Sequence, residues 1–104
     1  MLVFVDIRVN TKDWTEQELW DAWEDEVNAA AGANEAGKIK SIYKVSGQRR
    51  VLVTLDVDSH DELDAILMSG LPMAHNLEID EILPVRSYWD FADDVRNRWG
   101  AAGS

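Results

Sequence analysis

Glu26 is the carboxylate whose position best suits acid–base chemistry. It belongs to the series Leu19, Trp23, Glu26 and Ala30, whose spacing of three and four residues lines up along one side of a helix. A carboxyl group beside the Trp23 ring would be partly desolvated. Desolvation raises the pKa of a carboxyl group toward neutrality, as proton transfer requires. The alternative is a residue on the flank of the apolar stripe with its carboxylate turned to water, and spacing alone favours that plainer interpretation.

Aromatic side chains could form the wall of a binding pocket. Tyr43 falls on the same side of its predicted strand as Ile39 and Val45, which favours a core aromatic residue over a ligand contact. Three of the five tryptophans fall in or just before the first predicted helix: Trp14, Trp20 and Trp23. Core and subunit packing explain these three without a ligand, and we expect at least one of them to lie against another subunit.

Basic side chains offer a second route to substrate binding. Arg49 and Arg50 leave a predicted hairpin turn and could orient a substrate carboxylate through paired hydrogen bonds, although arginines beside a turn are usually solvated. His75, in the loop before the last predicted strand, could exchange a proton near pH 7. The chain has no glycine-rich phosphate loop, no serine nucleophile motif and no metal-binding pair of histidines, so we expect neither a metal nor a cofactor.

Length and charge limit the remaining functions. A chain of 104 residues forms one domain, and its formal net charge of −10 opposes binding to nucleic acid or to an anionic membrane surface. No apolar run approaches the roughly 20 residues that span a bilayer, and no secretion signal is visible. Cysteine is absent, which fits a reducing cytoplasm. We therefore expect a cytoplasmic protein whose partners are a small-molecule substrate and other copies of itself.

Hydrophobic periodicity predicts an α+β domain over residues 1–87. The predicted elements follow the order β-α-β-β-α-β: strand 2–9, helix 15–31, strands 39–45 and 51–57, helix 59–70 and strand 77–85. Thr15 with Glu18, and Ser59 with Glu62, have the spacing of capping boxes that begin the two helices. Gly32 is expected to end the first helix. This order is that of the ferredoxin-like fold, a four-stranded antiparallel sheet with two helices on one face.

Residues 88–104 are expected to form a C-terminal amphipathic helix followed by a disordered end. Tyr88, Phe91, Val95 and Trp99 recur at helical spacing, and the closing residues 100–104 are small. The apolar stripe of this helix needs a cover, which could be the bare face of the chain's own sheet or a neighbouring subunit. We therefore expect a homo-oligomer.

An ordered set of short segments resembles one known family over residues 1–85. The segments are Met1–Val5 followed by Asp6, the helix residue Glu26, Gly37, Val45-Ser46-Gly47, Leu55-Asp56-Val57 and Leu71-Pro72 leading to Leu77-Glu78-Ile79. Together they resemble the muconolactone Δ-isomerase family. The resemblance implies a ferredoxin-like fold in dimers or larger rings, with a pocket between sheet and helices that another subunit completes. It further implies a double-bond shift in an unsaturated lactone during aromatic catabolism, without metal or organic cofactor, with Glu26 as the proton-transfer residue.

Three positions depart from that family. Phe4, Ser41 and Gln48 stand where the family carries histidines, which favours a substrate bulkier or less polar than muconolactone. We therefore expect an isomerase or lyase with Glu26 as acid and base. The expected substrate contacts are Trp23, Tyr43, Arg49 and His75. Two alternatives stay open: a lactone hydrolase or elimination enzyme on the same scaffold, and a non-catalytic ligand-binding or assembly module.

Overall fold

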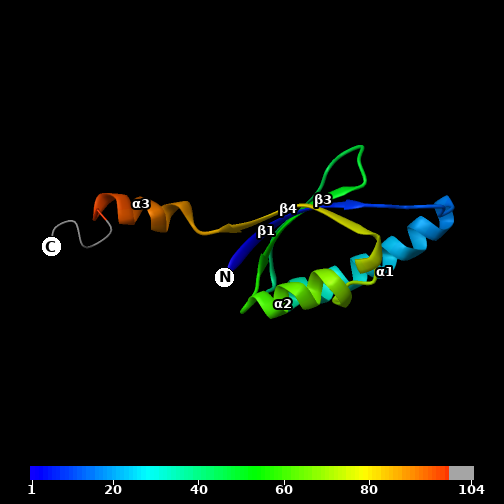
Figure 1. The fold of residues 1–104 in the computed structure, drawn as a ribbon, viewed down its shortest axis with the longest axis horizontal. Helices are drawn as coiled ribbons and strands as arrows, with labels where there is room; N and C mark the ends of the chain where they lie inside the picture. Colours follow the sequence, from blue (N-terminus) through cyan, green and yellow to red (C-terminus); the bar gives the residue numbers. More distant parts are fainter. Residues whose placement is uncertain (99–104) are drawn as a thin grey trace.

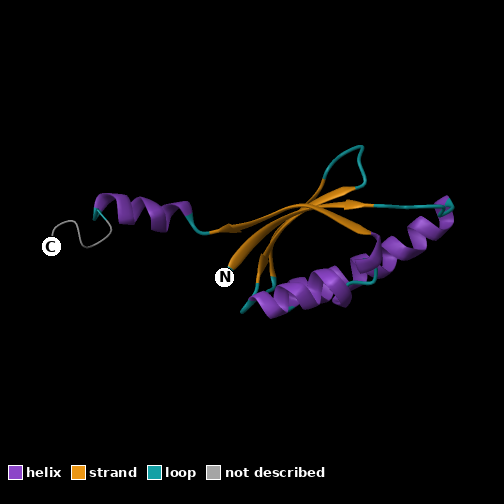
Figure 2. Cartoon of the chain, viewed as in Figure 1, coloured by secondary structure: helices purple, strands orange, loops and turns teal. Residues whose placement is uncertain are grey.

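The computed structural model describes residues 1–98, which form one sheet, three α-helices and two short turns of other helix types (Figures 1 and 2). In chain order the elements are β1 (Leu2–Val9), α1 (Glu16–Glu35), β2 (Ile39–Lys44), β3 (Arg50–Asp56), α2 (His60–Ala65), a π-helical turn (Ile66–Gly70), a 3₁₀ turn (Ala74–Asn76), β4 (Leu77–Val85) and α3 (Tyr88–Arg96). None of the helices within residues 1–98 is long and apolar enough to cross a membrane.

The sheet has the strand order β2-β3-β1-β4, and every pair of neighbouring strands is antiparallel. Helices α1 and α2 lie on the same side of it (Figure 1). This arrangement confirms the predicted ferredoxin-like fold. On β1, the alternation predicted from the sequence is also confirmed, because Val3, Val5 and Ile7 are buried on the side that carries the helices.

Both predicted helix starts are confirmed by their caps. The Thr15 hydroxyl oxygen accepts a hydrogen bond from the Glu18 backbone N–H at 3.2 Å, and Ser59 does the same for Glu62 at 3.1 Å. The predicted end of the first helix is wrong, because α1 continues through Gly32 to Glu35. The backbone turns at Gly37, whose φ of +78° is the left-handed conformation that glycine adopts without strain.

An irregularity in β2 overturns the prediction that Tyr43 is a core residue. Ile39 pairs with Leu55, but Ser41 pairs with Thr54, so the register between β2 and β3 shifts across one residue. An extra residue in a strand moves all later side chains to the opposite face. Ile42, opposite the buried Val53, therefore faces the helices. Tyr43 lies on the other face and is 69% exposed.

Helix α3 extends away from the sheet, and only Arg86 and Ser87 separate it from β4 (Figure 1). The Ser87 hydroxyl caps it by accepting from the Trp89 N–H at 3.2 Å. Tyr88 and Trp89 are largely exposed. The apolar stripe therefore does not cover the sheet of its own chain, and contact with a second subunit stays a prediction. Trp99 and the predicted disordered end at 100–104 lie outside the described residues.

Candidate active site

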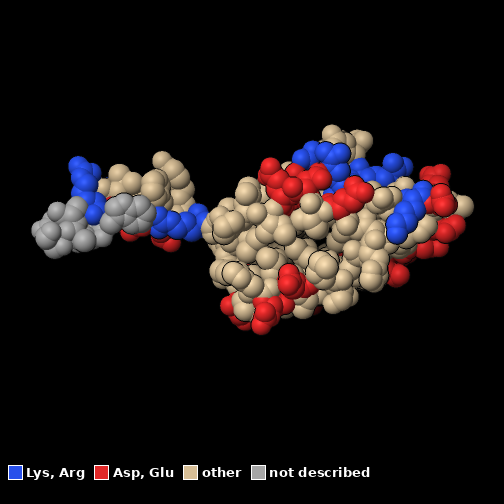
Figure 3. Space-filling view, in the orientation of Figure 1, with Lys and Arg blue, Asp and Glu red and all other residues tan. Residues whose placement is uncertain are grey.

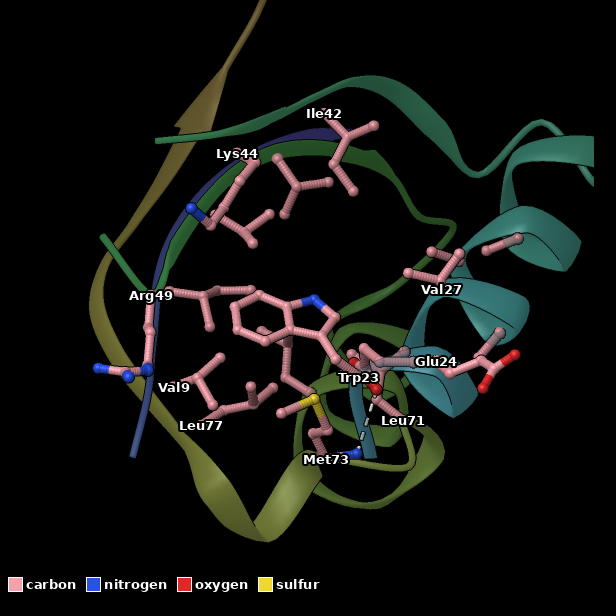
Figure 4. Close-up of a pocket in the computed structure, with 18 of the residues that line it drawn as sticks. Val9, Trp23, Glu24, Val27, Ile42, Lys44, Arg49, Leu71, Met73 and Leu77 are labelled. Atoms are coloured by element: carbon pink, nitrogen blue, oxygen red, sulfur yellow. Dashed lines mark hydrogen bonds between the residues drawn. The ribbon is translucent and has the colours of Figure 1, made fainter. Parts of the chain in front are cut away.

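A large apolar cavity lies between the sheet and the helices and has a volume of about 1530 Å³ (Figure 4). The sheet, the inner side of α1 and the segment after α2 all contribute side chains to it. Prominent among them are Val9, Ile42, Val53, Leu55, Leu19, Trp23, Val27, Leu71 and Met73. Such a lining offers a large apolar surface to a ligand.

Glu26 of α1 is half-buried and lines this cavity. The backbone N–H of Met73 donates a hydrogen bond to Glu26 Oε2 at 3.1 Å, drawn as a dashed line in Figure 4. Burial raises the pKa of the Glu26 carboxyl group above its ordinary value, and the hydrogen bond from Met73 partly opposes this rise. The carboxylate is therefore oriented through one oxygen and is a stronger base than a carboxylate in water.

The chain after α2 is built to bring the Met73 amide to Glu26. Its last helical residues form a π-helical turn that ends at Gly70. A Cβ atom on Gly70 would lie 2.8 Å from the Ala65 carbonyl oxygen, so a larger residue does not fit without a backbone shift. Met73 itself is 1% exposed, and its buried side chain holds its own backbone amide in place. No side chain in the sequence marks this donor, because it is a backbone N–H group. The neighbouring Leu71-Pro72 was noted only as one of the segments that resemble the family.

The structure brings three of the predicted site residues to the same cavity: Glu26, Trp23 and Arg49. The Trp23 indole lies across the middle of the cavity, and Arg49 lies in the wall at the hairpin end with its guanidinium directed away from the indole (Figure 4). Tyr43 and His75 are not among the lining residues. Tyr43 is on the opposite sheet face, and His75 is exposed in the 3₁₀ turn before β4.

The family departures are also separated in space. Gln48 lines the cavity, whereas Phe4 and Ser41 do not. Phe4 alternates with the buried Val3 and Val5 and so points to the sheet face without helices. Of these three departures, therefore, Gln48 is the one that lies in the cavity wall.

Two basic side chains near the site, those of Lys38 and Arg50, form ion pairs that were not predicted from the sequence. Lys38, in the cavity wall, lies 2.9 Å from Glu62 and 3.6 Å from Asp58. Arg50 was a possible contact for a substrate carboxylate, with a solvated side chain as the favoured alternative. It instead binds both carboxylate oxygens of the buried Asp6, with Nε 2.8 Å from Oδ1. The hydrogen bonds from Arg50 lower the pKa of Asp6, although burial acts in the opposite direction.

Metal binding finds no support in the arrangement of side chains. Across residues 1–98, no three or more histidine, aspartate or glutamate side chains are grouped in a way that could hold a metal ion. The chemically distinctive group in the cavity is the half-buried carboxyl of Glu26.

The fold and the site together define a ferredoxin-like α+β protein that holds a half-buried carboxyl group of raised pKa in an apolar cavity. Residues 1–91 match the family model described as Muconolactone delta-isomerase, and the chain belongs to this family of isomerases. It is also similar to a solved structure of muconolactone isomerase, with 23% sequence identity and a TM-score of 0.73 over 84% of this chain and 90% of that one. At this identity the likeness supports the fold. Comparison with curated proteins gave no match.

Proposed function

We propose that the chain is a cofactor-independent isomerase that shifts a carbon–carbon double bond in an unsaturated lactone or enone from aromatic catabolism. The observation that carries this proposal is the Glu26 carboxyl group, half-buried in an apolar cavity and oriented by the Met73 amide. Membership of the muconolactone isomerase family supplies the reaction class.

In the proposed reaction, ionised Glu26 removes a proton from a carbon in conjugation with the substrate carbonyl. The electron pair of the broken C–H bond moves into the carbonyl system and forms a dienolate. Protonated Glu26, which is half-buried and exchanges its proton with solvent water, then delivers a proton to a different carbon. The double bond moves, and the substrate gains and loses one hydrogen. General base catalysis contributes roughly 10² to 10⁴ in rate, which suffices for the acidified C–H bonds of lactones and enones.

The same residues suggest how a substrate is held. We propose that it lies against the Trp23 indole, which offers a flat apolar surface across the cavity. Arg49 is proposed to bind a polar group at the hairpin end. Tyr43 and His75 have no part in this proposal, because neither lines the cavity.

We further propose that the enzyme works as a homo-oligomer in the cytoplasm. Two observations support assembly: Leu83 and Val85 are exposed on the sheet face without helices, and Tyr88 is exposed on the projecting α3. Sedimentation at micromolar concentration tests it. A single species of 11.8 kDa would contradict it.

The isomerase proposal is tested by incubating the protein with a panel of unsaturated lactones and cyclic enones and identifying the products. An isomer of unchanged mass supports the proposal. An opened lactone or an eliminated fragment supports the alternative enzymes on this scaffold, and the absence of any product favours a binding module. Glu26→Gln should lower turnover by 10² to 10⁴. Asp25→Asn, an exposed neighbour outside the cavity lining, is the matched control and should turn over normally.

A further inference from the structure

The carbonyl oxygen of the proposed dienolate carries negative charge, and a hydrogen-bond donor beside it would stabilise that charge. Glu26 is engaged with the proton on carbon. Tyr43 lies on the opposite face of the sheet, and the Arg49 guanidinium is directed away from the Trp23 indole (Figure 4). The donor for this oxygen therefore has to come from another side chain of the cavity wall.

Several other side-chain donors in the cavity wall already bond within the protein. The pairs are Thr15 with Glu18, Trp20 with Glu16, Lys44 with the Val45 carbonyl and Lys38 with Glu62. Trp23 differs from them, because its indole N–H has no acceptor among residues 1–98. An indole nitrogen is a donor only. Its partner in the cavity is therefore a ligand or water.

Trp23 lies three residues before Glu26 on α1, and both side chains are half-buried in the wall of the same cavity. Side chains at this spacing are neighbours on a helix, with Cβ atoms about 5 to 6 Å apart, so one small ligand can touch both. In Figure 4 the indole nitrogen lies on the ring edge that is turned toward Val27 and Ile42. The remaining donors of the wall precede α1 or lie in the β2–β3 turn: Thr11, Trp14 and Gln48.

The surroundings of this N–H group strengthen a bond to a ligand. Val27 and Ile42 are apolar, and residues other than Lys, Arg, Asp and Glu cover most of the face between the sheet and α2 (Figure 3). A donor held where negative charge develops is worth more in an apolar site than in water, because it needs no reorganisation when the charge forms. Trp23 is thus placed to act on an oxygen that becomes negative.

We propose that Trp23 is a catalytic residue whose indole N–H donates a hydrogen bond to the carbonyl oxygen of the bound lactone or enone. This inference rests on the proposed function, with Glu26 at the reacting carbon and Trp23 at the oxygen. The hydrogen bond strengthens as the electron pair of the C–H bond moves toward the oxygen, and it weakens again when Glu26 protonates the other carbon. Trp23 keeps its own proton throughout. With about 1530 Å³ available, the apolar remainder of the ligand can lie against the ring face.

The contact is tested with coumarin and 2H-chromene, which carry C=O and CH₂ at the same ring position. Coumarin is an unsaturated lactone without a hydrogen on a saturated carbon, so it can bind but not isomerise. Trp23→Phe keeps an aromatic ring and removes the N–H. In this variant the affinity for coumarin relative to 2H-chromene should fall about fivefold, the effect of losing one hydrogen bond. Trp89→Phe, outside the cavity lining, is the matched control and should keep the wild-type ratio.

NMR of protein labelled with ¹⁵N in its tryptophans observes the N–H group directly, without a variant in the binding step. The chain has five tryptophans, and the indole signal that is absent from Trp23→Phe identifies Trp23. Coumarin should move the proton of this signal further downfield than 2H-chromene does, because only coumarin offers a carbonyl acceptor. The indole signal of Trp89 should move equally little with both ligands.

Three results would overturn the contact: no binding of coumarin, a Trp23 signal that responds alike to both ligands, or an unchanged affinity ratio in Trp23→Phe. With a substrate that the protein isomerises, Trp23→Phe should lower kcat by about 10² to 10³ and change KM far less, since the bond is strongest to the dienolate. A rise in KM alone would mean that Trp23 only offers a surface. Isomerisation that survives Trp23→Phe removes this inference and keeps the proposed function. A coumarin contact without isomerisation of any lactone or enone keeps Trp23 as the carbonyl donor and removes the proposed function.

Discussion

The backbone N–H of Met73 donates a hydrogen bond to Glu26 Oε2 over 3.1 Å and ties α1 to the segment that follows α2. The two residues are 47 positions apart in the chain, so the bond exists only when both helices are seated on the sheet. It fixes one carboxylate oxygen and leaves Oε1 as the acceptor that can face a substrate. The geometry of proposed catalysis therefore depends on the backbone between Ala65 and Met73.

Gly70→Ala should disturb this geometry. The new Cβ would meet the Ala65 carbonyl oxygen at 2.8 Å, and a backbone atom moves only together with its helix. We expect a loss of about 1 to 3 kcal/mol in the free energy of unfolding and a slower reaction. Chemical denaturation and turnover assays measure the two effects. Gly32→Ala is the control: it lies inside α1, its Cβ would meet nothing within 4 Å, and it should add about 0.5 to 1 kcal/mol.

The dependence of kcat/KM on pH should reveal the ionisation of Glu26. The base must be ionised, so activity should rise with pH through the pKa of this group. Burial raises the pKa above the ordinary value of 4.5, and the acid limb of the profile should therefore lie above pH 4.5. A limb centred below 4.5 would show that a different or more exposed carboxylate acts as the base.

Glu26→Gln should change stability in a pH-dependent way. Because the pKa of Glu26 is raised on folding, the folded state holds its proton more tightly than the unfolded state. The contribution of Glu26 to the free energy of unfolding therefore falls as pH rises from 4.5 through the folded pKa. Glutamine stays neutral, so the variant should gain stability relative to wild type between pH 4 and pH 8. Denaturation at both pH values tests this, with Asp25→Asn as the control for removing one negative charge from α1. If the difference in the free energy of unfolding between Glu26→Gln and wild type is the same at both pH values, or changes in the opposite direction, Glu26 is not buried as described.

The register shift in β2 predicts which neighbour contacts the ligand. Ile42 lines the cavity and Tyr43 faces away from it. Ile42→Ala should therefore weaken binding of an apolar ligand by about tenfold, the effect of losing one to two kcal/mol of apolar contact. Tyr43→Ala should leave the affinity within about twofold. A ligand titration in which Tyr43→Ala weakens binding and Ile42→Ala does not would contradict this. Tyr43 would then face the cavity, as regular alternation along β2 predicts.

Much of the fold was predictable because local signals agreed with the tertiary structure. The caps at Thr15 and Ser59 and the alternation along β1 each follow from residue types and spacing. The predictions failed where the local sequence was compatible with two structures. Gly32 and Gly37 can both end a helix, and α1 continues through Gly32, whereas Gly37 takes the left-handed conformation after its end. The alternation of β2 was wrong at Tyr43 because a single extra residue, invisible in composition, reverses the faces.

The site was predictable to a smaller extent. Helical spacing placed Glu26 beside Trp23, and both line the cavity. The amide of Met73 could not be predicted in this way, since every residue except proline carries the same donor. The pairing of Arg50 with Asp6 likewise depends on two strands that meet only in the sheet.

Solvent exchange tests the central claim, proton transfer by Glu26, most directly. A lactone or enone that the protein isomerises is incubated with it in deuterated water, and proton NMR follows the loss of signal at the positions conjugated with the carbonyl. Wild-type protein and Asp25→Asn should incorporate deuterium at equal rates, and Glu26→Gln should be slower by 10² to 10⁴. Retention of a tenth or more of the wild-type exchange rate by Glu26→Gln would contradict the account.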